Sequence, residues 1–567
     1  WSIFLLGSII LLSSSTSGAP AHKPKPITQP IITSGDGIPV AWNHQICPSY
    51  AQIIATPASL HDTPVIPVPN RRPSPLCRTF NSTSLELLIS TFNGRFKDER
   101  LARLFENSIS QTLDNTIRWF STDKNITETY IISGDITSEW LRDSTNQVNV
   151  YLPLIDSDKP LKQLILGVIN LQAKFITEGT YCNGFNPPKE SNIAIQSTPG
   201  VAQSASETPL ASLLRKAELE IDEVSLHTDY ERDFQRDLDT TSCNLGVDGL
   251  ASFLTLSNRF HSVTNETTFV TPTWLKAVEL SLQVFENESG ATSVSIGSNT
   301  GKPDSSVPAV NEGARHPQAY TGLVGTRLRP SNEPVIFPYN VPVNAMISVQ
   351  TSQLQKLLTS APLSPPSLKR RAAAISQNIN KALNVHAVTT HPIWGKIYAY
   401  ELDGFGSTAI MDDAAIPSLL SLPYIGWESL NSTIFKTTRR LLTSPDGNPF
   451  FFNGTSGFGI GSSHTGADKI WPMSLISLLF SSESAEEIES IIQILIDSTQ
   501  GYGVLHESFD AFKPEEFTRT WFAWVNSYFA EAILYLAEIN PGTIFKDSQP
   551  ILLTSQGNLA WYGGLRH

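Results

Sequence analysis

Cysteine is scarce in this chain, and the spacings that commonly bind zinc or calcium are missing. Only four of the 567 residues are cysteine, and no two of them form a Cys-x-x-Cys pair. The sequence also contains no His-Glu-x-x-His motif and no EF-hand loop. Since many zinc and calcium sites depend on these spacings, we predict a protein that uses no metal and no other cofactor.

Long basic runs and transmembrane-length apolar runs are missing as well. Lys and Arg number 40 against 53 Asp and Glu, which gives a formal net charge of −13 at pH 7. An excess of negative charge disfavours binding to nucleic acids and to anionic membranes, so we expect neither as a partner. The apolar run at residues 2–12, SIFLLGSIILL, is too short to span a bilayer comfortably.

The start of the chain has the pattern of a secretory signal. Small residues, STSGAPA, follow the apolar run and suit cleavage by signal peptidase. We predict a signal peptide over 1–19 and a secreted protein, soluble after cleavage; a buried helix or a membrane anchor is the alternative. N-glycosylation sequons agree with secretion, and they begin at Asn81, Asn125, Asn265, Asn287, Asn431 and Asn453.

The four cysteines are an even number, which fits disulfide bonding in a secreted protein. Three pairings are possible. We favour Cys47–Cys77 and Cys182–Cys243, because these pairs keep both closed loops local.

Apolar periodicity indicates a mainly α protein. About a dozen segments repeat at helical spacing between Gly-, Pro- and Asn-rich loops, and strand patterns are few and short. We therefore predict a toroid of helical hairpins over 84–545, after a Pro-rich arm at 20–83 and before a tail at 546–567. Residues 194–241 look like an irregular insertion, and 290–320 like a surface loop. The helical segments are 101–120, 160–176, 250–260, 273–285, 343–358, 368–383, 416–422, 434–442, 470–480, 485–496 and 521–536.

The most informative stretch is 133–147, SGDITSEWLRDSTNQ. Wound as a helix with Asp135 as its N-cap, it places Trp140 on an apolar face and Arg142 and Asp143 on a polar one. An Arg that donates, an Asp that accepts and a nearby aromatic ring together suit sugar binding. The alternative is an ordinary amphipathic helix whose charged face is solvated.

This stretch, with the valine that follows it, resembles the signature of glycoside hydrolase family 125, the exo-acting α-1,6-mannosidases. Further blocks agree with the family in order across most of residues 40–540, and the fungal secreted branch is the most similar in character. The resemblance implies an (α/α)6 barrel. It also implies a metal-independent, inverting exo-α-1,6-mannosidase that acts on α-mannosides or N-glycans, and we expect a monomer.

Glycoside hydrolysis needs an acid and a base or nucleophile, and the resemblance points to one residue for each role. In CNLGVDGLASF, Cys243 and Asp248 match the family's acid-bearing block. Apolar neighbours should raise the pKa of Asp248, as a general acid requires. Gly246 stands where the family has an acidic residue. A helix N-cap is the alternative role for Asp248.

The second block, HESF followed by FTRTWFAW, resembles the family's base-bearing segment and makes Glu507 the candidate general base. Arg519, Trp521 and Trp524 would form the wall behind it. Plain core packing is the alternative for the tryptophans.

Three other blocks resembling the family supply candidate sugar contacts. They add Arg329, Asn344, Asp403 and His464 to Arg142, Asp143, Arg519 and Trp521. Asp412 and Asp413 precede an expected helix, and we interpret them as capping residues rather than as a cation site. Two other functions stay open: a catalytically impaired relative that only binds mannosides, suggested by Gly246, and a helical-toroid hydrolase of another α-glycan.

Overall fold

The computed structural model describes residues 32–33, 39–40, 47–58, 65–121, 126–193, 240–291 and 317–553. The expected signal peptide, Asn125, residues 194–239 of the expected insertion and most of the expected 290–320 loop lie outside these ranges. None of the described helices combines the length and apolar character needed to cross a membrane.

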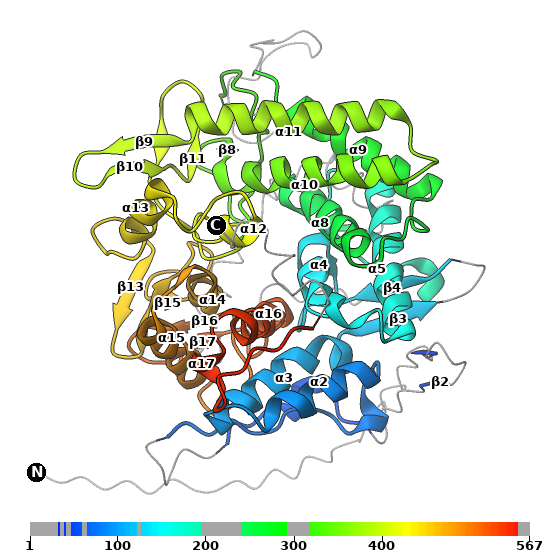
Figure 1. Cartoon of the computed structure of the whole chain (residues 1–567), viewed down its shortest axis with the longest axis vertical. Coiled ribbons are helices and arrows are strands. Elements are labelled where there is room, and N and C mark those ends of the chain that lie inside the picture. Colours follow the sequence, from blue (N-terminus) through cyan, green and yellow to red (C-terminus); the bar gives the residue numbers. More distant parts are fainter. Residues whose placement is uncertain are drawn as a thin grey trace, which may run out of the picture.

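In the part of the chain that the structure describes, six helices form a closed inner ring (Figure 1). Each contacts the next, and the last returns to the first, because α16 packs against α4. In ring order the six helices are α4 (Leu141–Asn149), α8 (Val247–Thr264), α10 (Val341–Ser360), α12 (Leu422–Ile425), α14 (Pro472–Ser481) and α16 (Ala523–Ile539).

Outer helices alternate with the inner ones along the chain, which makes the fold an (α/α)6 barrel as predicted. Burial separates the two sets: all ten residues of α14 are buried, whereas α11 buries only six of its 21 residues, spaced as one stripe. The outer helices are α3 (Glu99–Asn115), α5 (Lys159–Glu178), α9 (Pro272–Glu288), α11 (Pro366–His386), α13 (Thr433–Leu442) and α15 (Ala485–Asp497).

Three small antiparallel sheets lie at the N-terminal ends of inner helices, because one strand of each leads directly into such a helix. These leading strands are β5 before α4, β8 before α10 and β15 before α14. The loops that carry the candidate site residues are thereby held at one end of the barrel. The sheets are β5 (Glu139–Trp140), β6 (Gly184–Phe185) and β7 (Thr240–Ser242); β8 (Tyr339–Asn340), β11 (Glu401–Leu402) and β12 (Thr408–Ala409); and β15 (Lys469–Ile470), β16 (Ser508–Asp510) and β17 (Phe517–Thr518).

Most of the predicted helices are confirmed, with small shifts at their ends, but three predictions at element boundaries were wrong. The helix predicted over 101–120 ends at Asn115, because β3 (Ile117–Ser121) pairs with β4 (Glu128–Ile131). Asp135 is not an N-cap; α4 begins only after Trp140, since 139–140 belong to a sheet.

The third error is the helix predicted at 416–422, which is the four-residue α12 instead. The carboxylate of Asp412 accepts the backbone N–H groups of Leu419 and Leu420 at 2.9 and 3.1 Å. These two N–H groups therefore donate to a side chain and not to the carbonyl groups of a preceding helical turn. Asp412 thus caps a turn, as its interpretation as a capping residue implied.

Both favoured disulfides are present. Cys47–Cys77 closes the N-terminal arm, which includes α1 (Tyr50–Ile53), and Cys182–Cys243 joins the segments on either side of 194–239. The arm leads into α2 (Thr83–Asn93), which packs on α3. Residues 240 and 241, the end of the segment that we expected to be irregular, form β7 together with Ser242 beside this second disulfide.

Candidate active site

Arg142 joins two of the predicted acidic residues at the start of α4. Its Nη1 lies 2.9 Å from Oδ2 of Asp248, and its Nη2 lies 3.1 Å from Oδ1 of Asp143. The guanidinium carbon lies 4.5 Å from the ring centroid of Trp524. Arg142 and Asp143 are only 6% and 4% exposed. The alternative of a solvated charged face is therefore wrong, because every residue of α4 is buried.

Asp248 is the second residue of α8, and its role as an N-cap is excluded because Gly246 occupies that position. The expected apolar neighbours are present, since Leu245, Val247 and Leu250 are all buried. The ion pair with Arg142 was not predicted, so the surroundings are not purely apolar. A Cβ atom at Gly246 would lie 2.8 Å from Oδ1 of Asp248, so the glycine leaves room for the carboxyl group.

Glu507 immediately precedes β16 and is 6% exposed. Its Oε1 lies 3.5 Å from Nη1 of Arg519. The Nε of Arg519 donates to Oδ1 of Asp135 at 2.7 Å, and its Nη2 donates to the carbonyl of Ser133 at 3.2 Å. Arg519 therefore ties the base-bearing segment to the loop that precedes α4.

Asp143 connects the two halves of the site electrostatically. Burial raises the pKa of Asp143 above its ordinary value, while the positive charges of Arg142 and Arg519 oppose this rise. The side chains thus form a series of alternating charge from Asp248 through Arg142, Asp143 and Arg519 to Glu507. The fold brings together the predicted acid, the predicted base and three predicted sugar-binding residues.

Trp521 does not share this polar environment. Its ring packs edge-on against Tyr50 of the arm, with centroids 4.6 Å apart, in an apolar cluster that includes Ile54 and Val504. This packing agrees with the core-packing alternative, and a sugar contact by Trp521 stays a prediction. Trp524, in contrast, lies under the guanidinium of Arg142.

Arg329 lies in a second buried ion pair. Its Nε lies 2.7 Å from Oε1 of Glu401, and the other oxygen of Glu401 accepts the backbone N–H groups of Ile336 and Phe337 at 2.8 and 3.1 Å. Both charged side chains are at most 4% exposed. This pair shapes the loop before α10. Glu401 was missed because nothing in its local sequence links it to an Arg 72 residues away.

The side chain of His464 is exposed. Its Nδ1 lies 2.8 Å from Oε1 of Glu333, and its ring lies edge-on to Trp471, with centroids 6.3 Å apart. Glu333 was also missed by the sequence analysis.

Two predicted sugar contacts are instead used within the chain. The amide of Asn344 is fully buried and bonds the N–H and carbonyl of Val324 at 2.7 and 2.9 Å. Oδ1 of Asp403 accepts three backbone N–H groups of the turn at 405–407. Burial disfavours ionisation of Asp403, but hydrogen bonds from this turn outweigh it and lower the pKa. Both side chains position backbone in the folded chain, and their role as sugar ligands stays a prediction.

Asp413 joins three loops. Its Oδ2 accepts hydrogen bonds from the hydroxyls of Ser331 and Ser462, both at 2.8 Å, and its Oδ1 accepts the N–H of Ala415 at 3.1 Å. Within the described ranges, no group of three or more His, Cys, Asp or Glu side chains is arranged to bind a metal ion.

Comparison with known proteins decides the family. The model of the metal-independent α-mannosidases, GH125, matches residues 98–534. The chain belongs to family GH125. The Schizosaccharomyces pombe "Meiotically up-regulated gene 157 protein" is 37% identical over 530 residues, covering 91% of this chain and 97% of that protein. A Streptococcus pneumoniae metal-independent α-mannosidase, solved with α-1,6-mannobiose in a non-productive complex, is similar with a TM-score of 0.66 and 27% identity over 81% of this chain and 99% of its own.

As a GH125 protein, the chain is a glycoside hydrolase of the α-mannosidase type, and its charged series lies within the matched residues. His506, next to the candidate base, is an uncharged neighbour. Burial lowers the pKa of its imidazole to about 4, although backbone hydrogen bonds oppose this. Its ring stacks on Phe517 with centroids 3.7 Å apart. The imidazole therefore adds packing and no charge beside Glu507.

Proposed function

We propose that this GH125 protein is a secreted exo-α-1,6-mannosidase that inverts the anomeric centre. Asp248 is the general acid, and Glu507 is the general base. The observation that carries the proposal is the charged series, which links both carboxyl groups through Arg142, Asp143 and Arg519. Inverting glycosidases keep their two carboxyl groups apart, so that a water fits between the base and the sugar.

The reaction follows from these positions. Protonated Asp248 donates its proton to the glycosidic oxygen as the bond to C1 of mannose breaks. Glu507 takes a proton from a water that attacks C1 from the opposite face, which releases β-mannose. Arg142 is shared between Asp143 and Asp248, and it holds the carboxyl group of Asp248 in place. Arg519 fixes the carboxylate of Glu507 for the incoming water.

The substrate class is supported by the relative from Streptococcus pneumoniae, whose structure contains α-1,6-mannobiose and whose description concerns the processing of N-linked glycans. Secretion is supported by two disulfides, which persist in oxidising compartments. It is also supported by the sequons, because the five asparagines that fall in described residues are all exposed: Asn81, Asn265, Asn287, Asn431 and Asn453.

The test is to incubate the protein with α-1,6-mannobiose and to follow the anomeric protons of released mannose by NMR at early times. Inversion gives β-mannose first, and mutarotation then produces the α-anomer. If α-mannose appears first, the mechanism is retaining and Glu507 is not a general base. If an α-1,2- or α-1,3-linked disaccharide is cleaved and the α-1,6-linked one is not, the linkage is wrong.

A catalytically impaired, mannoside-binding protein is the second candidate, and Gly246 is the observation that favours it. The glycine lacks the acidic side chain that the family resemblance predicts beside Asp248. Binding of α-1,6-mannobiose by calorimetry without any release of mannose would establish this second function and exclude the first.

A further inference from the structure

We propose that the N-terminal arm, residues 47–58 and 65–80, is a clamp that positions the base-bearing loop, residues 501–507, and that Arg71 is its main positioning residue. The arm precedes residues 98–534, the part of the chain that the family model matches. The inference rests on the proposed role of Glu507 as general base.

Arg71 holds the arm and the loop together through main-chain carbonyls. On the loop, Nε donates to the carbonyl of Tyr502 at 2.7 Å, and Nη2 donates to that of Gly501 at 3.3 Å. On the arm, the guanidinium donates to the carbonyls of Ile53 and Thr56 at 2.8 and 2.6 Å. Because a guanidinium presents its donors in a rigid fork, one side chain fixes the distance between the two segments.

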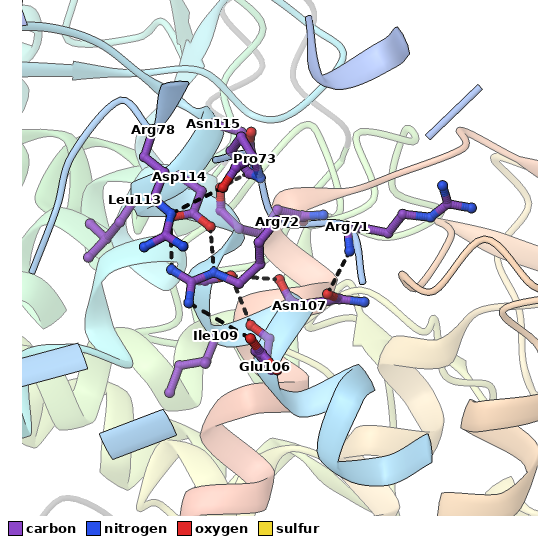
Figure 2. A network of polar contacts seen from close by, with 12 residues as sticks. Arg71, Arg72, Pro73, Arg78, Glu106, Asn107, Ile109, Leu113, Asp114 and Asn115 are labelled. Atoms are coloured by element: carbon purple, nitrogen blue, oxygen red, sulfur yellow. Dashed lines mark hydrogen bonds and ion pairs between the residues drawn. The ribbon is translucent and has the colours of Figure 1, made fainter. Parts of the chain in front are cut away.

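Asn107 of α3 repeats this connection on the other side of the loop. Its Nδ2 donates to the carbonyls of both Pro69 and Gly503, at 2.8 and 2.7 Å. Its Oδ1 accepts the N–H of Arg71 at 3.0 Å (Figure 2). The backbones approach so closely that a Cβ at Gly503, whose φ is +74°, would lie 2.7 Å from the carbonyl oxygen of Pro69. Only glycine fits both the φ angle and the contact.

The arm also contacts the chain just after Arg519, the residue that pairs with Glu507. Tyr50 contacts Trp521, which lies two residues after Arg519, and its hydroxyl accepts a hydrogen bond from Gln111 at 3.0 Å. Val504 of the loop belongs to the same apolar cluster. The arm therefore touches the chain on both sides of the Glu507–Arg519 pair.

The arm has its own attachment to the barrel, independent of the loop. Arg72 bonds the buried carboxylate of Asp114 on α3, with Nε 2.8 Å from Oδ2 (Figure 2). It also pairs with Glu86 on α2. The Cys47–Cys77 disulfide closes the arm on itself. The arm is thus a fixed surface against which the loop is held.

The distance from clamp to base is short. The loop runs from Gly501 to Glu507, and its second half has further anchors. The N–H and carbonyl of Leu505 bond the amide of Asn526 at 3.0 and 2.9 Å, and the N–H of Glu507 donates to the carbonyl of Thr518 at 3.2 Å. Nδ1 of His506 lies 2.7 Å from the carbonyl oxygen of Thr520. Loss of Arg71 removes its bonds to Gly501 and Tyr502, while the bond from Asn107 to Gly503 and the anchors of the second half remain. We expect Glu507 to become displaced and mobile, without loss of the fold.

The experiment compares Arg71→Met and Arg71→Lys with Arg95→Gln as matched control. Arg95 also ties a distant segment, through Asp547, Gln549 and the ring of Phe545, all of which lie outside the arm and the loop. We expect Arg71→Met to lower kcat on α-1,6-mannobiose by about 10- to 100-fold, since misplacement by about 1 Å can cost 10²-fold. KM should change much less, Arg71→Lys should recover part of kcat, and Arg95→Gln should behave as wild type.

Hydrogen exchange in the absence of substrate tests the clamp separately from the reaction. Peptides covering 499–509 should exchange faster in Arg71→Met, while peptides of α8 should not change. If Arg71→Met does not fold, a Cys47→Ser/Cys77→Ser variant replaces it, with the same expected result. Unchanged exchange in 499–509 overturns the clamp, and faster exchange with unchanged kcat overturns its role in catalysis. Absence of mannose release by the wild type would instead refute the proposed function.

Discussion

Replacing Glu507 with Gln, and Asp248 with Asn in a second variant, tests the two proposed catalytic roles separately. The Glu507→Gln exchange keeps size and hydrogen bonding but removes the charge that accepts a proton from water. Its structural cost is small, because Arg519 loses one contact at 3.5 Å and keeps Asp135 and the carbonyl of Ser133. We expect a loss of about 1–2 kcal/mol in the free energy of unfolding, a minor part of the stability of a typical domain.

The effect on rate is much larger. Loss of a positioned general base costs about 10²- to 10⁴-fold, which corresponds to about 2.7–5.4 kcal/mol in the activation barrier. Glu507→Gln should therefore be crippled on every substrate, because water always needs activation. Asp248→Asn should be crippled on a mannobiose but less impaired on a nitrophenyl mannoside, whose leaving group departs without protonation.

The assay measures kcat/KM of both variants and of the wild type on α-1,6-mannobiose and on nitrophenyl α-mannoside. Thermal unfolding and calorimetric binding of the mannobiose provide the controls for folding and for substrate affinity. Equal losses for the two variants on both substrates would refute the assignment of acid and base. Full activity in Glu507→Gln would remove this residue from the mechanism and direct attention to another carboxylate near the site, such as Asp143.

Four further predictions follow from single features of the chain. Burial raises the pKa of Glu139 from 4.5 to about 8, so the folded state binds a proton more tightly than the unfolded state and loses stability as pH rises through that interval. In Glu139→Gln this decline in the free energy of unfolding with pH should disappear. If chemical denaturation at several pH values shows the same decline in the variant, the burial argument is wrong. In Gly246→Ala the new Cβ displaces the carboxyl group of Asp248, which should lower kcat about tenfold. The loss of the glycine N-cap should lower the free energy of unfolding by about 1 kcal/mol. Unchanged kcat would show that the position of Asp248 is not critical. Chelators should leave mannose release intact, and inactivation that calcium or zinc reverses would reveal a metal site. Mass spectrometry of secreted protein without reductant should find no free thiols and a mass loss on deglycosylation; four free thiols and an unchanged mass would count against secretion.

The folded chain adds most to the sequence-based predictions where a buried side chain contacts another part of the chain. Asn344 and Asp403 have the polarity of sugar ligands, yet their side chains bond nearby backbone. Trp521 has the shape of a sugar platform, yet it packs on Tyr50. Residue type alone predicts what a side chain can bind. Which group it does bind depends on the atoms that the fold places within about 3 Å.

Other features could be predicted because their cause is local. The apolar residues of α11 repeat every three or four positions, so this short stretch of sequence is enough to predict the helix and the face that it buries. Both disulfides join cysteines that are neighbours in chain order. The block order of the chain pointed to GH125 and to Asp248 and Glu507 within it, and the family match confirms the first of these.

The sequence by itself thus determined most of the helices and the family, and it favoured the disulfide pairing that the structure has. Only the tertiary structure decided that Arg142 would pair with Asp248 across 106 residues, and that Arg71 would hold the carbonyl of Tyr502 across 431. The physical reason is that periodicity is a property of neighbouring residues, whereas the partner of a buried charge depends on which helix ends and loops meet when the ring of helices closes.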